Sequence, residues 1–366
     1  MKVTFFTLSM AMGGAERVIK NLAEKYAEQG HQVSIITCFK AKEEYIIASG
    51  IKRVVLEQAE TQQLNKVLRF ARRRKRLVRE LKKVQSDVLI CFLPEPCLLA
   101  LSMKFNIQCP IIISERSDPN VLYGKGMFSF VVRKMYNKAD GCVFQTEGAR
   151  AYFDDKIQKK SCIIINPLNE AFLDDPYTGV REKEIVTVGR LYKAKNQAMM
   201  IRAFARFHEK CPEYHLTIYG EGSLREKLQQ LIEQCHMTEH ITLYGQTTKI
   251  YDRIHKASLF VISSNYEGMP NALLEAMAIG VPVVATDCPC GGPGSLIEDC
   301  VNGRLIPVGD ESALYQVFLD MSENSEQYAE YAKKALKIRE EANPTKICRL
   351  WQEYINRVMD SNANCQ

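Results

Sequence analysis

Short apolar runs alternate with longer polar segments along almost the whole chain. The runs are brief and partly branched, which is typical of buried strands, and several intervening segments repeat apolar residues at helical spacing. In the first half the predicted strands are 3–8, 32–38, 52–56, 87–92, 110–115, 141–146 and 161–165. In the second half they are 185–188, 215–219, 241–244, 259–262 and 281–285. Strands that alternate with helices predict an α/β protein with doubly wound parallel sheets.

The alternation is interrupted once near the middle and once near the end. A polar stretch with two prolines and a glycine follows residue 165, and such a stretch is typical of a linker. We therefore predict an N-terminal Rossmann-like domain over 1–168, a linker over 169–184 and a second such domain over 185–343. Pro344 then begins a last helical segment, 344–366. A chain of 366 residues has the length of about two domains.

Composition narrows the class of protein. Hydrophobic residues make up 46% and charged residues 25%, as in ordinary globular proteins. The thirteen cysteines are scattered, often inside predicted strands, which favours buried thiols in a reducing cytosol over disulfides. Cys288 and Cys290 lack partners at zinc spacing, so we predict no metal site. No apolar run reaches about 18 residues, so no transmembrane helix is predicted.

Residues 66–83 carry ten basic side chains and one acid, although the whole chain has a net charge of only +6. Seven apolar residues could form a stripe on one side of this helix: Val67, Leu68, Phe70, Ala71, Leu77, Val78 and Leu81. A basic amphipathic helix suggests an anionic membrane surface or a lipid diphosphate. The alternative is a helix packed on the core with a solvated basic face. Neither a pattern of aromatic residues interleaved with basic ones nor a helix-turn-helix pattern accompanies this run, so we do not expect nucleic acid as a partner.

The pattern of residues 259–286 predicts a strand, a loop, a helix and a second strand. Together these elements form one crossover unit of a parallel sheet. Asn271 is expected to cap the helix, and Gly280 is expected to end it. Two carboxylates mark the unit, Glu267 in the loop and Glu275 in the first turns of the helix.

Ligands of open parallel sheets bind outside the carboxyl ends of the strands, where Glu267 is predicted to lie. Gly268 allows the backbone to approach a ligand, and the N–H groups near Asn271 offer donors to an anion or a hydroxyl. Such a site suits a polyhydroxyl group attached to a phosphate. Alternatively, Glu267 is a solvated loop acid and Glu275 is a first-turn acid favoured by the helix dipole.

The run from Glu267 to Thr286 resembles the Glu-x7-Glu signature of the family 4 retaining nucleotide-sugar glycosyltransferases. The run Gly-Arg-Leu…Lys-Asn at 189–196 resembles a second motif of that family. The resemblance covers nearly the whole chain and is strongest over 190–286. It implies the GT-B fold, in which two facing Rossmann-like domains enclose a cleft, and a last helix that packs back on the first domain.

The same resemblance implies an activity. A sugar, from a UDP-hexose or UDP-N-acetylhexosamine, would pass with retained configuration to a hydroxyl of a lipid-linked saccharide in surface polysaccharide synthesis. No metal or other cofactor would be required. The enzyme would be cytoplasmic and peripheral on the inner face of the membrane, with 66–83 against the anionic surface.

The resemblance also assigns roles to residues. Arg190 and Lys195 would clamp the diphosphate, because arginine offers a planar fork and lysine a compact charge. Glu267 would orient the sugar and complete the catalytic set with those two cations, and Glu275 would bind the ribose. The donor-binding set it implies is Gly13, Gly14, Arg190, Lys195, Glu267, Gly268, Met269, Pro270, Asn271, Leu274 and Glu275.

Three points stay open in the sequence. Gly13 and Gly14 stand between a strand and a helix, where they either approach the donor or simply form a tight turn. Relatives often carry a histidine near 114–119, where this chain has Glu115, Arg116 and Asp118, which either serve the acceptor or pair with neighbours. A non-catalytic nucleotide-sugar-binding protein and a nucleotide-sugar epimerase are the competing functions on the same fold.

Overall fold

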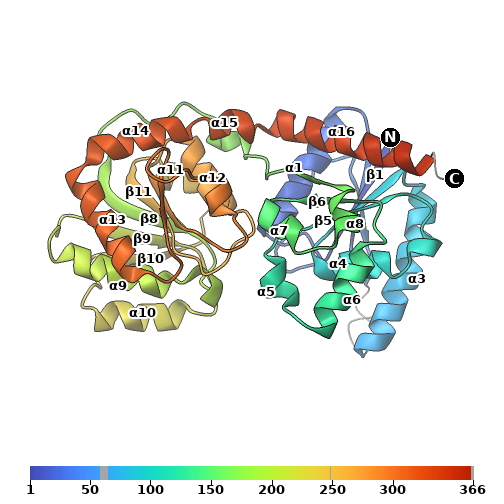
Figure 1. Ribbon diagram of the computed structural model, residues 1–366, viewed down its shortest axis with the longest axis horizontal. Coiled ribbons are helices and arrows are strands. Elements are labelled where there is room, and N and C mark those ends of the chain that lie inside the picture. Colours follow the sequence, from blue (N-terminus) through green and yellow to red (C-terminus); the bar gives the residue numbers. More distant parts are fainter. Residues whose placement is uncertain (58–64, 248, 364–366) are drawn as a thin grey trace. The chain divides into compact units, whose positions relative to one another are not determined.

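The computed structural model describes residues 1–57, 65–247 and 249–363. The chain forms two compact units (Figure 1): unit 1 comprises Met1–Pro167 with Pro344–Gln366, and unit 2 comprises Leu168–Asn343. The stretch 169–184, predicted as a linker, lies in unit 2. It holds a 3-10 helix, η2 (Glu170–Phe172), and the first residues of strand β8 (Glu182–Val188), which begins before the apolar run that predicted it.

Unit 1 contains one parallel sheet of seven strands in the order β3-β2-β1-β4-β5-β6-β7. The strands are β1 (Lys2–Thr7), β2 (Gln32–Thr37), β3 (Lys52–Val55), β4 (Val88–Phe92), β5 (Ile111–Ser114), β6 (Gly141–Phe144) and β7 (Ser161–Ile163). The connecting helices are α1 (Gly14–Glu28), α3 (Lys66–Val84), α4 (Pro94–Leu101), η1 (Lys104–Asn106), α5 (Pro119–Tyr123), α6 (Met127–Tyr136), α7 (Glu147–Ala151) and α8 (Asp155–Gln158). Each predicted strand of the first half is present, with ends that differ by one or two residues.

The last helix, α16 (Pro344–Ala363), contributes to the core of unit 1. Figure 1 shows it beside α1, and the two helices pack together. Trp351 is fully buried and stacks on Phe92 of β4 with ring centroids 6.1 Å apart. The Tyr354 hydroxyl accepts a hydrogen bond from the Cys142 N–H at 2.7 Å, at the start of β6. The end of the chain is therefore an integral part of unit 1.

Unit 2 contains a parallel sheet of six strands in the order β10-β9-β8-β11-β12-β13. Besides β8, these are β9 (His215–Tyr219), β10 (Ile241–Gly245), β11 (Ala257–Ile262), β12 (Val283–Thr286) and β13 (Arg304–Ile306). The helices are η3 (Lys193–Lys195), α9 (Gln197–His208), α10 (Arg225–Gln234), α11 (Ile250–Ile254), α12 (Asn271–Ala278), η4 (Pro293–Ser295), α13 (Glu311–Glu323), α14 (Ser325–Ala335) and α15 (Ile338–Glu341).

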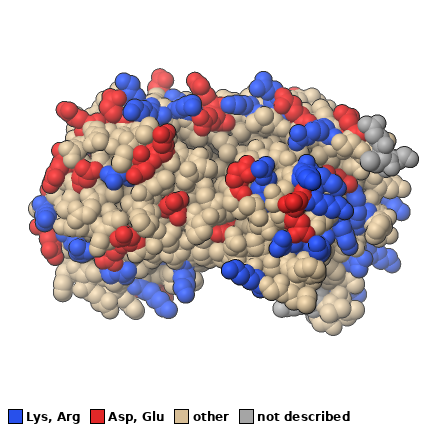
Figure 2. Space-filling view, viewed as in Figure 1, with Lys and Arg blue, Asp and Glu red and all other residues tan. Residues whose placement is uncertain are grey.

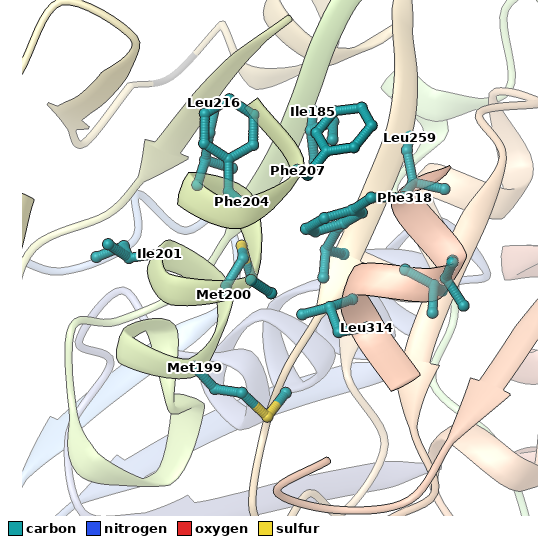
Figure 3. Packing of buried hydrophobic residues seen from close by; sticks show 14 of the residues in the cluster. Ile185, Met199, Met200, Ile201, Phe204, Phe207, Leu216, Leu259, Leu314 and Phe318 are labelled. Carbon is teal, nitrogen blue, oxygen red and sulfur yellow. The ribbon is translucent and has the colours of Figure 1, made fainter. Parts of the chain in front are cut away.

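Aromatic side chains fill the core of unit 2 between the sheet and helices α9 and α13 (Figure 3). Phe207 of α9 lies 5.6 Å from Phe318 of α13, centroid to centroid, and both are fully buried. Leu216 and Leu259 of the sheet pack in the same cluster. This packing holds the strands from which the candidate site is built.

The start of α12 differs from the prediction, and its end agrees. Asn271 is the first helical residue rather than the cap, because the Pro270 carbonyl already accepts from the N–H groups of Leu273 and Leu274 at 3.1 and 3.3 Å. Gly280 has a φ of +71°, and the Val281 N–H donates to the Ala276 carbonyl at 3.0 Å. This is the left-handed helix ending for which glycine is preferred.

Helix α3 spans the predicted basic segment, but its apolar stripe is buried only toward its end. Leu77 and Leu81 are buried, whereas Val67 is 77% exposed. Arg73 is itself buried and pairs with Glu57 at 2.6 Å. Only part of helix α3 is packed on the core, and its first turns present apolar side chains to the outside.

Three further features of the described residues bear on function. Their cysteines are all free, and most are buried. No group of three or more His, Cys, Asp or Glu side chains within 1–57, 65–247 and 249–363 is arranged to hold a metal ion. Over the same residues, no helix is both long and apolar enough to cross a membrane.

Candidate active site

The order of strands in unit 2 reverses beside β8. From β8 the chain proceeds to β9 and β10 on one side, and β11 then begins the series on the other side. Strands β8 and β11 are neighbours, and the loops that leave their carboxyl ends lead to opposite sides of the sheet. Open α/β sheets bind ligands at the point where the strand order reverses in this way. Most of the predicted site residues lie on these two loops.

The loop after β8 carries Arg190 and Lys195. Arg190 is exposed, and its guanidinium carbon lies 5.3 Å from the centroid of the Tyr192 ring. Its carbonyl accepts from the Gln197 side chain at 3.1 Å, which ties the loop to the start of α9. Lys195 ends η3 and is half-buried, and a Cβ atom at Gly189 would lie 3.4 Å from its aliphatic stem.

The loop after β11 is fastened to the loop after β8 by main-chain contacts. The Ser263 hydroxyl donates to the Lys195 carbonyl at 2.9 Å. The Asn265 N–H donates to the Ala194 carbonyl at 2.7 Å, and its side chain donates to the Lys193 carbonyl at 3.0 Å. These hydrogen bonds hold the two loops, which are about 70 residues apart in the chain, in a fixed position relative to each other.

The centre of this arrangement is an ion pair. The Lys195 ammonium donates to Oε1 of Glu267, and the Ser264 hydroxyl donates to the same oxygen at 2.6 Å. The Lys195 and Glu267 side chains are 24% and 13% exposed, so both charges are partly withdrawn from water. Two of the three predicted catalytic residues, Lys195 and Glu267, therefore contact each other directly, and the Ser264 hydroxyl also binds Glu267.

The end of the loop after β11 and the first turns of α12 supply the remaining residues of the Glu-x7-Glu motif. Met269, Pro270, Leu274 and Glu275 are buried, and Asn271 is half-buried. Glu275 is a buried carboxylate, and α12 has no acidic residue in its first turn, so Glu275 is not the first-turn acid of the alternative interpretation.

Backbone packing sets the position of the Glu267 loop. A Cβ atom at Gly292 would lie 1.6 Å from the Gly268 carbonyl oxygen, so only glycine fits there. The backbone at Gly268 thus lies close to Gly292, which precedes η4, and its approach to a ligand stays a prediction. At the other side of the site, a Cβ at Gly220 would lie 2.0 Å from the Gly189 carbonyl oxygen.

Gly13 and Gly14 belong to unit 1, and unit 2 carries the other nine predicted donor-binding residues. Gly13 precedes α1, which begins at Gly14. A Cβ at Gly13 would lie 2.4 Å from a carboxylate oxygen of Glu16, which is itself buried. A side chain at position 13 would therefore require the buried Glu16 carboxylate to move, and the donor contacts of Gly13 and Gly14 stay a prediction.

Glu115 and Asp118 are engaged by neighbouring groups. The Glu115 carboxylate is buried and accepts from the hydroxyls of Tyr123 and Tyr136, each at 2.8 Å. Burial raises the pKa of this carboxyl, and the hydrogen bonds from the two tyrosines oppose the rise. Asp118 caps α5 by accepting from the Asn120 N–H at 2.9 Å.

Arg116 lies against aromatic rings at the carboxyl end of β5. Its guanidinium carbon is 5.2 Å from the Phe92 centroid and 5.4 Å from the Trp351 centroid. Its Nε donates to Ser114 at 2.6 Å, and Nη1 donates to Asn166 at 2.9 Å. Burial lowers the pKa of this guanidinium to about 9. Like Glu115, the side chain pairs with its neighbours.

Two family models match the chain on either side of residue 172. Residues 12–171 match the model described as Glycosyltransferase Family 4, and residues 175–338 match the model described as Glycosyl transferases group 1. The chain belongs to the family 4 glycosyltransferases. Both motifs of the candidate site of this glycosyltransferase lie within the matched regions, whereas strand β1 and helix α16 of unit 1 lie outside them.

Individual proteins resemble the glycosyltransferase over most of its length. A Campylobacter jejuni protein named N-acetylgalactosamine-N,N'-diacetylbacillosaminyl-diphospho-undecaprenol 4-alpha-N-acetylgalactosaminyltransferase is 29% identical, over 97% of this chain and 99% of the relative. A second C. jejuni protein, a GalNAc-alpha-(1->4)-GalNAc-alpha-(1->3)-diNAcBac-PP-undecaprenol alpha-1,4-N-acetyl-D-galactosaminyltransferase, is 27% identical over 86% of this chain and 87% of its own length. The crystal structure of Anabaena HepE in complex with UDP matches with a TM-score of 0.81 and 18% identity, covering 98% of this chain and 100% of HepE. The last likeness establishes the GT-B fold.

Sequence reasoning missed three residues that shape the site of this glycosyltransferase. Ser264 binds Glu267, Asn265 joins the two loops, and Gly292 permits the approach to Gly268. The polar run Ser-Ser-Asn directly before Tyr266 was a visible signal for the first two. Gly292 lies in the glycine- and proline-rich stretch after β12, where the sequence does not indicate which glycine is constrained.

Proposed function

We propose that this glycosyltransferase transfers a hexose or an N-acetylhexosamine from a UDP-sugar to a hydroxyl of a lipid-linked saccharide, with retention of configuration, in surface polysaccharide synthesis. Two relatives of nearly full length bear names of α-N-acetylgalactosaminyltransferases that act on undecaprenol-linked saccharides. The structural match to a UDP complex supports uridine as the nucleotide.

The observation that carries this proposal is the contact between Lys195 and Glu267 where β8 and β11 diverge. A cation there meets the requirement of the reaction, because the bond between the sugar C1 and the diphosphate oxygen breaks and leaves negative charge on the diphosphate. Positive charge that is already in place stabilises a developing anion without the cost of reorganising solvent. In the proposed complex, Arg190 and Lys195 both contact the diphosphate.

The other charged groups position the donor. Glu267 accepts hydrogen bonds from sugar hydroxyls, and Glu275 accepts them from the ribose. The acceptor oxygen bonds to C1 on the face that the diphosphate leaves, and its proton passes to the leaving phosphate oxygen. The step as proposed uses no metal and no further cofactor. We also propose main-chain contacts from Gly13 and Gly14 of unit 1 to the donor, and this part of the proposal rests on the family resemblance alone.

We further propose that the enzyme is cytoplasmic and binds the inner face of the membrane through the basic helix α3. Arg72, Lys75 and Arg79 are exposed, whereas Arg73 is buried in its pair with Glu57 and is unsuited to this role. Exposed cations near an anionic surface contribute about 1 kcal/mol each. Replacing the three exposed residues by Gln should lower binding to anionic vesicles about a hundredfold at low salt, and unchanged binding would exclude α3 as the contact.

Product analysis tests the reaction. Purified enzyme is incubated with a UDP-sugar and a lipid-linked saccharide, and the products are identified by mass spectrometry and NMR. Free UDP together with an acceptor extended by one α-linked sugar is the expected result. An altered UDP-sugar without transfer would identify an epimerase instead, and binding of the nucleotide without turnover would identify a non-catalytic protein.

A further inference from the structure

The hairpin formed by α5 and α6 in unit 1 presents large apolar side chains to the outside. Met127, Phe128 and Phe130 are 79%, 57% and 57% exposed. Val121, Leu122 and Val131 are exposed as well. Figure 2 shows uncharged surface over the lower part of unit 1, where Figure 1 places α6, with Lys and Arg side chains beside it. Contiguous exposed apolar groups of this kind mark an interaction surface.

Helix α6 carries apolar side chains on two faces, one that packs into unit 1 and one that is exposed. Ser129, Val132 and Tyr136 point into unit 1 and are buried. Met127, Phe130 and Val131 follow one another at helical spacing on the other side. The core of unit 1 therefore does not bury this second set of side chains. Only another apolar partner outside the unit would remove them from water.

The hairpin is held in a definite shape. Gly124 and Gly126, on either side of Lys125, both have positive φ angles, +59° and +105°, and form the sharp turn between the helices. The Tyr152 hydroxyl donates to the Gly124 carbonyl at 3.0 Å. The Tyr123 hydroxyl donates to the buried Glu115 carboxylate at 2.8 Å. These anchors fix the tip that carries Met127 and Phe128.

Cationic side chains flank the apolar tip. Lys125 is exposed within the turn. Arg133 and Lys134 follow on α6, where Asp154 pairs with them at 2.6 and 3.1 Å and offsets part of their charge. Helix α4 packs against both α6 and α3, so the basic helix α3 and the hairpin share a neighbouring helix within the unit. Aromatic and aliphatic groups with lysines and arginines behind them suit the boundary between acyl chains and anionic headgroups.

We propose that the α5–α6 hairpin inserts its apolar tip into the interface of an anionic lipid bilayer. The inference rests on the proposed membrane location of the enzyme and adds to it the segment that enters the lipid. The two contributions differ in kind. The electrostatic attraction of α3 to the anionic surface is screened by salt, because the Debye length falls to about 3 Å at 1 M. The insertion of apolar side chains is not electrostatic, so it persists at that salt concentration. The hairpin therefore retains the enzyme on vesicles at high salt.

Quenching by brominated lipid tests the insertion directly. The natural Trp351 is fully buried in unit 1 and provides a constant background. Phe128→Trp places an indole at the tip, and Phe105→Trp is the matched control on η1, where the side chain is 97% exposed. Phe105 lies just before β5 and the hairpin just after it, so they mark opposite ends of that strand. Quenching of Phe128→Trp alone, in vesicles with brominated acyl chains, is the expected result.

A triple variant measures how much the tip contributes. Met127→Ser/Phe128→Ser/Phe130→Ser changes exposed side chains only and should keep the thermal unfolding midpoint. Its partition onto anionic vesicles in 1 M salt should fall at least about tenfold, since three large apolar groups no longer leave water. The proposal is overturned by an unchanged partition, by equal quenching of both tryptophan variants, or by lipid-independent self-association that the triple variant abolishes.

The same variants separate this proposal from the proposed reaction. UDP release from the donor in detergent solution, without vesicles, reports the chemistry and should be unchanged in the triple variant. Full release combined with a lack of quenching would reject the hairpin and leave the transferase intact. Quenching at the tip without any release would reject the reaction and leave the membrane contact.

Discussion

Gly292→Ala is the substitution whose effect follows most directly from the geometry of the site. The added Cβ would lie 1.6 Å from the Gly268 carbonyl oxygen, and real Cβ atoms essentially never come closer than 3.0 Å to such an atom. The two backbones must therefore separate by about 1.4 Å. Since Gly268 directly follows Glu267, this movement displaces the carboxylate that contacts Lys195.

The size of this displacement sets the expected losses of activity and of stability. A misplacement of about 1 Å at a reacting centre costs about a hundredfold in rate, and forced overpacking destabilises a fold by about 1–3 kcal/mol. We expect kcat/KM for the donor to fall about a hundredfold in Gly292→Ala, and the urea midpoint to fall as well. Both are measured on purified enzyme, by nucleotide release and by circular dichroism.

Gly294→Ala is the matched control in the same segment. Its Cβ would meet a carboxylate oxygen of Asp287 at 2.9 Å, and Asp287 is an exposed side chain that rotates away. This variant should keep activity within about twofold, because a flexible side chain yields without backbone movement. Wild-type kinetics in Gly292→Ala, or an equal loss in Gly294→Ala, would refute the argument that backbone packing positions the Glu267 loop.

Three further predictions follow from buried polar groups. Glu275→Ala should raise the donor KM about tenfold or more, since charge-assisted hydrogen bonds contribute about 1.5–3 kcal/mol, and wild-type KM in steady-state assays would exclude the ribose role. Tyr354→Phe should lower the unfolding free energy by about 1–3 kcal/mol in urea titrations, because the Cys142 N–H loses its buried acceptor. Burial raises the pKa of Glu115, so the folded state holds its proton more tightly than the unfolded state. The stability of wild type relative to Glu115→Gln should therefore fall as pH rises above about 4.5 in urea titrations, and a constant difference would contradict this.

Local pattern predicted most of the fold because each strand is a short apolar run bounded by polar residues. Strand β13 was missed since it has three residues, Arg304–Ile306, of which the first is charged. The helix start at Asn271 was misplaced because the Pro270 carbonyl begins the turn one residue earlier. Both errors concern ends and short elements, where local signals are weakest.

The sequence named residues for the candidate site, and their roles stay a prediction, but it did not predict the contacts between them. The resemblance named Lys195 and Glu267, yet their pairing depends on β8 and β11 being neighbours, which no local pattern encodes. The same holds for Gly292, whose partner is Gly268 on another loop. For helix α3 the amphipathic pattern was visible, but the burial of Arg73 against Glu57 came from tertiary packing.

The central claim is that Arg190 and Lys195 stabilise the departing diphosphate of a nucleotide sugar. The most direct test measures free nucleotide released from UDP-, GDP- and ADP-sugars, with and without membrane lipid extract, in wild type, Arg190→Ala/Lys195→Ala and Lys193→Ala. Lys193 is an exposed cation of the same η3 turn and serves as the control. We expect release from UDP-sugars that is stimulated by the extract, retained in Lys193→Ala and at least about a hundredfold slower in the double variant. Undiminished release in the double variant would contradict it.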